Sequence, residues 1–176
     1  FDAALPPHRH WDRGGTRPVL ALHCSLAHAG AWSGLAEAMH AVTVTAMDFI
    51  GHGRARDWDG VEDLHAQSTA EAIALAETLG QGQPLDLIGH SFGGTVALRI
   101  AATRPDLVRS LTLVEPVFFA AARDAQDPAW DAFIADHRDF GALVASGQRR
   151  EAARQFHAMW GAGEAFDDLP DRMQTY

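Results

Sequence analysis

Short apolar runs alternate with longer amphipathic stretches along the chain up to residue 116. The runs are rich in valine, leucine and isoleucine, as expected of strands that are covered on both faces. Strands are predicted at residues 19–23, 42–47, 85–88 and 108–114, and helices at residues 31–40, 68–80 and 92–103. Strands that alternate with helices predict right-handed crossovers, and therefore a parallel sheet with helices on both faces.

Local signals refine the ends of these elements. Ser68 and Glu71 have the spacing of a capping box, so the second helix is expected to begin at Ser68 and to end near Gly80. Residues 1–17 are polar and contain several prolines and glycines. His8 and His10 form a His-x-His pair without a third ligand near in sequence, so we favour a short antiparallel edge hairpin there over a metal site.

The pattern changes after Pro116. Residues 117–176 are predicted to be helical and amphipathic, are rich in alanine and aromatic residues, and contain no evident strand. We interpret residues 1–116 as the core and residues 117–176 as a helical lid. Phe118 and Phe119 directly follow the last strand, so we expect them in the wall of a substrate pocket. The alternative is that these aromatic residues only fill the space between helices.

The most informative stretch is Gly-His-Ser-Phe-Gly-Gly at residues 89–94, between a predicted strand and a predicted helix. Glycines on both sides of Ser91 are expected where a sharp turn leaves no room for a Cβ. Such a turn exposes the serine hydroxyl next to the first amides of the helix, which favour a developing negative charge. Ser91 is therefore the candidate nucleophile; the alternative is a glycine-rich turn with an incidental serine.

Four polar residues fall at or just beyond the carboxyl ends of the predicted strands, namely Ser25, Asp48, Ser91 and Glu115. In parallel sheets the ligand site lies beyond these ends. The sequence therefore predicts one functional edge of the sheet.

Composition excludes several classes of function. Hydrophobic residues make up 47% and charged residues 21% of the 176 residues, as in a soluble globular domain. No apolar run approaches the roughly 20 residues of a membrane span, so no membrane partner is expected. The net charge of -9 argues against a nucleic-acid partner. We expect a small-molecule acyl substrate.

The numbers of lysines and cysteines exclude further kinds of catalytic and metal site. All 14 cationic residues are arginines, which excludes a Schiff-base lysine. Cys24 is the single cysteine, so an internal disulfide and a cysteine-rich zinc site are excluded, and a reducing, cytoplasmic location is favoured. No dinucleotide-binding glycine pattern or cluster of metal ligands is present, so we expect no cofactor and no metal.

Three ordered segments together resemble the α/β-hydrolase fold family of the esterase and C–C hydrolase type. Residues 89–94 resemble its nucleophile elbow. Leu-His-Cys-Ser at residues 22–25 resembles its oxyanion turn, with Cys24 in place of the usual glycine. Residues 48–55 resemble its Asp-x-x-Gly-His-Gly-x-Ser loop, with Ala55 in place of the serine. The resemblance implies a three-layer α/β sandwich with a helical lid.

The resemblance also implies roles for particular residues. Ser91 would attack the substrate carbonyl, and the backbone N–H groups of Phe92 and Ser25 would form the oxyanion hole. His28 lies in the oxyanion loop and is a candidate substrate contact. His23 is expected to hold that loop by hydrogen bonds, rather than to act as the base.

The acid and the histidine of the family's triad have no clear counterpart. In the family the acid follows a strand beyond the lid, and the histidine follows the last strand. Glu115 is a candidate acid at the end of the strand before the lid, but we favour the alternative that it lines the pocket wall or anchors the loop. His137 and His157 lie in the predicted lid and are poor candidates for the base.

Sheet physics leads to a related expectation. The strand at residues 108–114 would expose a long unpaired edge, which proteins seldom tolerate. We therefore expect the C-terminal core strands to be missing from these 176 residues, with the triad completed beyond residue 176 or by another chain.

Two functions remain open from the sequence. The first is a serine hydrolase that cleaves a carboxylic ester or thioester through an acyl-enzyme on Ser91, with C–C bond hydrolysis or acyl transfer as related chemistries. The second is a non-catalytic ligand-binding protein on the same fold.

Overall fold

The structure is a computed structural model that describes residues 5–161 and 163–174, except for the side chains of Asp136, Arg172 and Met173. The chain divides into two compact units, Phe1–Val117 and Phe118–Tyr176. Of the segments interpreted from sequence, residues 1–4, 162, 175 and 176 lie outside the described part.

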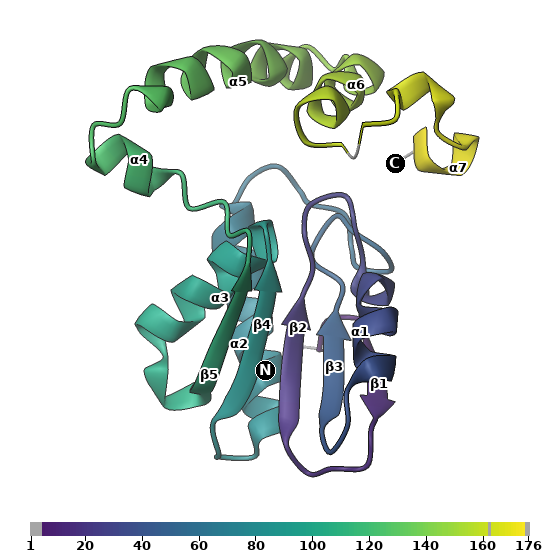
Figure 1. The fold of residues 1–176 in the computed structure, drawn as a ribbon, viewed down its shortest axis with the longest axis vertical. Helices are drawn as coiled ribbons and strands as arrows, with labels where there is room; N and C mark the ends of the chain where they lie inside the picture. The colour runs from purple at the N-terminus through teal and green to yellow at the C-terminus, as the bar shows by residue number, and fades with distance from the viewer. Residues whose placement is uncertain (1–4, 162, 175–176) are drawn as a thin grey trace. The chain divides into compact units, whose positions relative to one another are not determined.

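The N-terminal unit is built on a five-stranded sheet with the order β1-β3-β2-β4-β5 (Figure 1). Its strands are β1 (His8–Asp12), β2 (Pro18–Leu22), β3 (Thr43–Met47), β4 (Leu85–His90) and β5 (Val108–Val114). Strands β2 to β5 pair in parallel, and β1 pairs antiparallel with β3. The sheet is therefore mixed, with its antiparallel strand at one edge.

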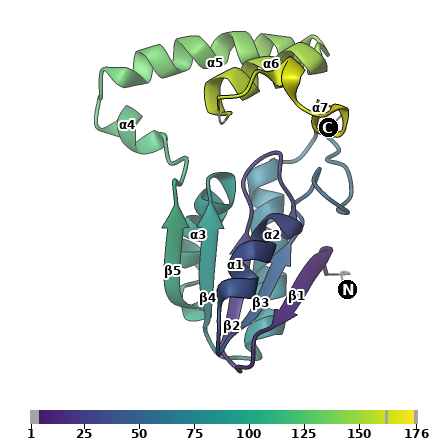
Figure 2. The ribbon, with the colours of Figure 1, turned by 45° about the vertical axis from the view of Figure 1, so that its right-hand side comes forward.

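Helices cover the two faces of this sheet, as the two ribbon views show (Figure 2). The helical elements are η1 (Ala29–Trp32), α1 (Ser33–Ala38), α2 (Leu64–Gly80), α3 (Phe92–Thr103) and the short η2 (Pro105–Leu107). The expected three-layer α/β sandwich is confirmed.

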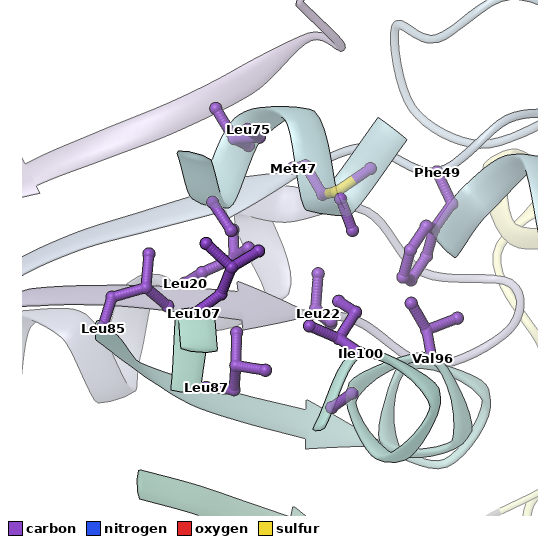
Figure 3. Packing of buried hydrophobic residues seen from close by; sticks show 13 residues of the cluster. Leu20, Leu22, Met47, Phe49, Leu75, Leu85, Leu87, Val96, Ile100 and Leu107 are labelled. Atoms are coloured by element: carbon purple, nitrogen blue, oxygen red, sulfur yellow. The ribbon is translucent and has the colours of Figure 1, made fainter. Parts of the chain in front are cut away.

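The core between the sheet and α2 and α3 follows from the alternation of side chains along each strand. Leu20 and Leu22 of β2 point to this face and are fully buried. They pack with residues of β3, β4, α2 and α3, including Met47, Leu87 and Ile100 (Figure 3). This layer fixes β2 beside β4, the two strands from which the candidate site is built.

The intervening residues of β2 face the other layer. Val19 and Ala21 pack with Ala29, Trp32 and Ala36 of η1 and α1. Small residues on this face allow the short helical segment to approach the sheet closely. The segment that carries Ser25 is thus held at both ends, by β2 and by η1.

Two local expectations are wrong. Helix α2 begins at Leu64, and its N-cap is Asp63, whose carboxylate accepts the Ala66 N–H at 2.5 Å. Ser68 is a buried residue inside the helix, so the capping-box pattern was coincidental. The residue after the helix, Gln81, takes the left-handed conformation expected at Gly80.

The predicted N-terminal hairpin is also wrong. Strand β1 is an antiparallel edge strand as expected, but its partner is β3 and not its neighbour in sequence, β2. His8 and His10 lie on this strand. The described residues contain no group of three or more possible metal-ligating side chains.

Strand β5 forms the other edge of the sheet. Leu111 and Leu113 pack against the core, whereas Ser110, Thr112 and Val114 are exposed. The strand is therefore buried on one face only, unlike the both-face burial expected from its sequence.

The C-terminal unit contains only helical elements within the residues that the structure describes. They are α4 (Ala120–Asp124), α5 (Ala129–Ala145), α6 (Arg149–Trp160), η3 (Phe166–Asp168) and α7 (Asp171–Gln174). The rings of Phe119 and Phe133 are tilted by 41° with a centroid distance of 4.2 Å, and the Trp160 ring lies 5.8 Å from that of Phe119. Aromatic contacts of this kind hold the unit together internally.

Candidate active site

Ser91 sits between the end of β4 and the start of α3, in a backbone conformation that L-residues rarely adopt. Its φ is 52° and its ψ is -115°. Its N–H donates to the Val114 carbonyl of β5 at 2.9 Å, which anchors the turn to the neighbouring strand. Residues held in such conformations cluster at functional sites, because the surrounding structure must offset a strain of about 1–3 kcal/mol.

The side chain of Ser91 takes no part in capping the helix or in holding the turn. The residue is half-buried, and its hydroxyl does not cap α3. Among the described residues, Oγ has no hydrogen-bond partner. The hydroxyl is therefore neither sunk in the core nor committed to a structural bond.

Two of the glycines around Ser91, Gly89 and Gly93, are required by close backbone contacts, and Gly94 is closely packed. A Cβ on Gly89 would lie 2.4 Å from the Gly93 carbonyl oxygen, and one on Gly93 would lie 2.3 Å from that of Leu22. A Cβ on Gly94 would approach Pro116 at 3.1 Å. The turn at residues 89–94, hereafter the Ser91 turn, is thus wedged between the ends of β2 and β5.

The turn after β2 (residues 23–26, hereafter the Ser25 turn) lies against the Ser91 turn. The Gly93 N–H donates to the His23 carbonyl at 3.1 Å, which joins the two turns directly. Within the described part of the chain, the N–H groups of Phe92 and Ser25 donate no hydrogen bond. Two adjoining turns therefore carry two unused backbone donors, which is what an oxyanion hole requires.

His23 holds the Ser25 turn from below. Its Nδ1–H donates to the Cys24 carbonyl at 2.7 Å, and its Nε2 accepts the Phe49 N–H at 3.1 Å. Burial lowers the pKa of His23 to about 4, against the smaller opposing effect of the Cys24 carbonyl. The imidazole is therefore neutral at neutral pH. Both of its nitrogens make hydrogen bonds, which is the loop-holding role that the resemblance to the family implied.

Asp48, which follows β3, has a structural role. Its buried carboxylate accepts the Ala29 N–H at 2.7 Å and the Arg54 N–H at 3.1 Å. Burial raises its pKa, but these two donors outweigh burial, so that the pKa is lowered. A Cβ on Gly53 would lie 2.5 Å from this carboxylate, which explains the glycine. Asp48 thus ties η1 to the loop after β3.

The remaining candidates of the N-terminal unit, His28 and Glu115, lie directly before η1 and directly after β5. His28 is the N-cap of η1, and its Nδ1 accepts the Gly30 N–H at 3.0 Å. Glu115 follows β5 with a φ of 45°, and its side chain is 86% exposed. Its Oε2 lies 3.8 Å from Nε2 of His90, so these two side chains are close enough to pair when His90 is protonated.

Cys24, the residue in place of the usual glycine, is half-buried and has a free thiol. Burial raises the pKa of this thiol. A protonated thiol is a poor nucleophile, so Cys24 does not compete with Ser91 for that role.

Phe118 and Phe119 belong to the C-terminal unit. Phe118 is exposed, and the ring of Phe119 packs on Phe133. Their expected place in a pocket wall remains a prediction.

A separate hollow of about 460 Å³ lies along the β1 edge. It is lined by His8, Arg9, His10, Trp11 and Arg54, and so by none of the predicted site residues. Sequence reasoning also overlooked a polar link between His65 and Thr95, which packs behind Phe92. No local motif marks this link, because its members lie on different helices.

A family model described as alpha/beta hydrolase fold matches residues 17–176. Lipase LipV of Mycobacterium tuberculosis is 39% identical over 108 residues, which are 61% of this chain and 40% of the relative. Human monoglyceride lipase is 29% identical over 124 residues, which are 66% of this chain and 41% of the relative.

A solved structure of a lipase is also similar to this chain. The monoacylglycerol lipase of Paleococcus ferrophilus is similar with a TM-score of 0.55 and 26% identity, over 62% of this chain and 42% of that structure. The chain therefore spans about two fifths of the length of these relatives. None of the described helices is both long enough and apolar enough to traverse a bilayer.

Proposed function

Because this chain belongs to the α/β hydrolase fold family, we propose that the protein is a serine hydrolase with Ser91 as its nucleophile. The observation that carries the proposal is the conformation of Ser91. Ser91 has a φ of 52° between Gly89 and Gly93, which close backbone contacts require, and among the described residues neither its hydroxyl nor the Phe92 N–H has a hydrogen-bond partner.

The reaction follows from this geometry. Ser91 Oγ attacks the carbonyl carbon of an ester, and its proton passes to a general base outside the described residues. The negative charge that develops on the carbonyl oxygen is met by the N–H groups of Phe92 and Ser25. The tetrahedral intermediate expels the alcohol, and the acyl group stays on Ser91 until water releases it as a carboxylic acid.

The proposed substrate class is a carboxylic ester of the monoglyceride type. It is supported by relatives that are named as lipases and monoglyceride lipases. We also propose that the helical unit Phe118–Tyr176 serves as the lid, as its amphipathic helices and aromatic residues suggest. Phe118 and Phe119 at its start are then proposed to contact the acyl chain.

A fluorophosphonate probe tests the nucleophile in the whole protein that carries this chain. We expect covalent labelling of Ser91, its loss in Ser91→Ala, and its retention in Ser146→Ala, which removes an exposed hydroxyl of the helical unit. Hydrolysis of a monoacylglycerol should be lost in parallel. Labelling that survives Ser91→Ala would refute the proposal, and a labelled enzyme that cleaves only C–C bonds would refute the substrate class.

A further inference from the structure

A directed chain of hydrogen bonds runs from the surface of α3 to the Ser91 turn. Arg99 Nη1 lies 3.1 Å from Nδ1 of His65, and Nε2 of His65 lies 3.0 Å from Thr95 Oγ1. Thr95 Oγ1 in turn donates to the Phe92 carbonyl at 2.7 Å. His65 is on the first turn of α2, whereas Thr95 and Arg99 are on α3.

The chemistry of the donors fixes the direction of every bond. A guanidinium can only donate, so Nδ1 of His65 must be the acceptor and carry no proton. Nε2 then bears the hydrogen and donates to Thr95 Oγ1, whose own proton goes to the Phe92 carbonyl. The chain therefore requires one state of His65, the neutral Nε2–H tautomer.

The surroundings of His65 favour this neutral state. Burial first, and then the Arg99 guanidinium, lower the pKa of His65, although Asp63 and the bond to Thr95 act in the opposite direction. Asp63 lies before α2 and is 3.9 Å from Arg99, so it draws the guanidinium toward this site. The imidazole ring also packs against the Phe92 ring in an edge-to-face arrangement, with a centroid distance of 5.5 Å.

The chain ends on a peptide that is held from both sides. The Phe92 carbonyl accepts from Thr95, and the Gly93 N–H of the same peptide donates to the His23 carbonyl. Hydrogen bonds that share a peptide polarise one another, so loss of one weakens the other. The bond to His23 is the one that joins the Ser91 turn to the Ser25 turn.

We propose that His65 is a positioning residue for the oxyanion hole, which its neutral Nε2–H form aligns through Thr95 and the Phe92–Gly93 peptide. The inference rests on the proposed function, because it assigns a purpose to the N–H groups of Phe92 and Ser25. Protonation of His65 would place two donors, Nδ1–H and the Arg99 guanidinium, face to face. The bond between Arg99 and His65 is then lost, and with it the contact that orients the Nε2–H toward Thr95.

The first test does not depend on activity. Nitrogen-resolved NMR of the imidazoles in the whole protein should show His65 as the Nε2–H tautomer at neutral pH. Thr95→Val should shift the Gly93 amide signal, whereas Thr103→Val should not. Thr103 is the matched control, because it makes the same kind of bond to the Arg99 carbonyl at the far end of α3. An Nδ1–H tautomer would overturn the proposal.

The second test measures the rate of fluorophosphonate labelling. His65→Phe and Thr95→Val should each slow labelling by about 10-fold or more, since a small misplacement of reacting groups is costly. The double variant should be no slower than either single variant, because both break one chain. Unchanged labelling in both single variants would overturn the inference.

His65→Gln separates positioning from mere packing. Its side-chain amide keeps a donor for Thr95 and an acceptor for Arg99 but cannot be protonated. Labelling near neutral pH should stay close to the wild-type rate, because a donor and an acceptor are kept, and the fall in rate toward acid should be shallower than in the wild type. An equally steep fall would refute the role of His65. If Ser91 is never labelled, the proposed function fails, and the NMR result still decides whether the chain exists.

Discussion

The Gly93 N–H donates to the carbonyl of His23 at 3.1 Å, and this bond brings two turns from distant parts of the sequence together. A Cβ added to Gly93 would lie only 2.5 Å from the same carbonyl oxygen. The hydrogen bond therefore requires a glycine at position 93, because only a residue without a side chain lets the amide come this close.

Gly93→Ala should damage both stability and reactivity. The new methyl group would meet the Leu22 and His23 carbonyls, and the Ser91 turn would have to move away from the Ser25 turn. We expect a loss of about 1–3 kcal/mol in unfolding free energy and a marked loss of fluorophosphonate labelling. Gly34→Ala is the control, since its Cβ would meet no atom within 4 Å. Equal behaviour of the two variants would argue against the wedged turn.

Asp48→Asn should loosen the loop after β3 and the start of η1. Oδ1 accepts the Ala29 N–H and Oδ2 accepts the Arg54 N–H, so an amide would turn an NH2 donor toward one of these two N–H groups. A cost of about 1–3 kcal/mol in unfolding free energy is expected for the unsatisfied buried donor. Denaturant unfolding measures it, with the exposed Asp12→Asn as a control that should cost much less. A cost no larger than that of Asp12→Asn would contradict this role.

Stability should fall as the pH drops from about 6.5 toward 4. The pKa of His23 is about 4 in the folded chain and ordinary when unfolded, so between these values the unfolded state binds the extra proton. The effect of this residue reaches about 3 kcal/mol at the acid end of the window. Urea unfolding at several pH values measures it, and His23→Gln should show a weaker dependence. An unchanged dependence would show that His23 is not the buried neutral imidazole described above.

Asp86→Asn should affect stability but not chemistry. Its carboxylate receives two bonds from Arg109 at 2.9 Å, one from Ser110 at 2.6 Å and one from Arg17 at 2.5 Å. Burial would raise its pKa, but these donors hold the pKa well below its usual range. We expect the unfolding free energy to fall by about 2 kcal/mol. The loss is no larger because both arginines are partly exposed to solvent.

Because Asp86 lies far from Ser91, an effect on stability can be told apart from an effect on the reaction. Asp86 lies near the start of β4, about 16 Å along the strand from Ser91. Under conditions where the variant remains folded, labelling of Ser91 should proceed at the wild-type rate. A slowed reaction would mean that this ionic cluster also supports the active site.

Local sequence was sufficient for much of the sheet and for the Ser91 turn. Helix α3 and strand β5 have the predicted bounds, since a glycine-flanked turn and a following proline mark their ends within a few residues. The start of α2 was misplaced, because the pattern at Ser68 looked like a cap whereas the cap, Asp63, is defined by its bond to Ala66. Burial of Ser68 is a property of the packed core and leaves no local signal.

The sequence alone determined the succession of strands and helices along the chain and the strained turn at Ser91. Spacing, glycines and apolar periodicity act between close neighbours in the chain, so they can be recognised in the sequence. Only the tertiary structure decided that β1 pairs with β3, that Asp48 ties two loops together, and that His65 reaches Thr95 across 30 positions. Such contacts depend on which buried donors and acceptors meet after the chain has folded. Each buried polar group must find a partner there, and its partner can lie anywhere in the sequence.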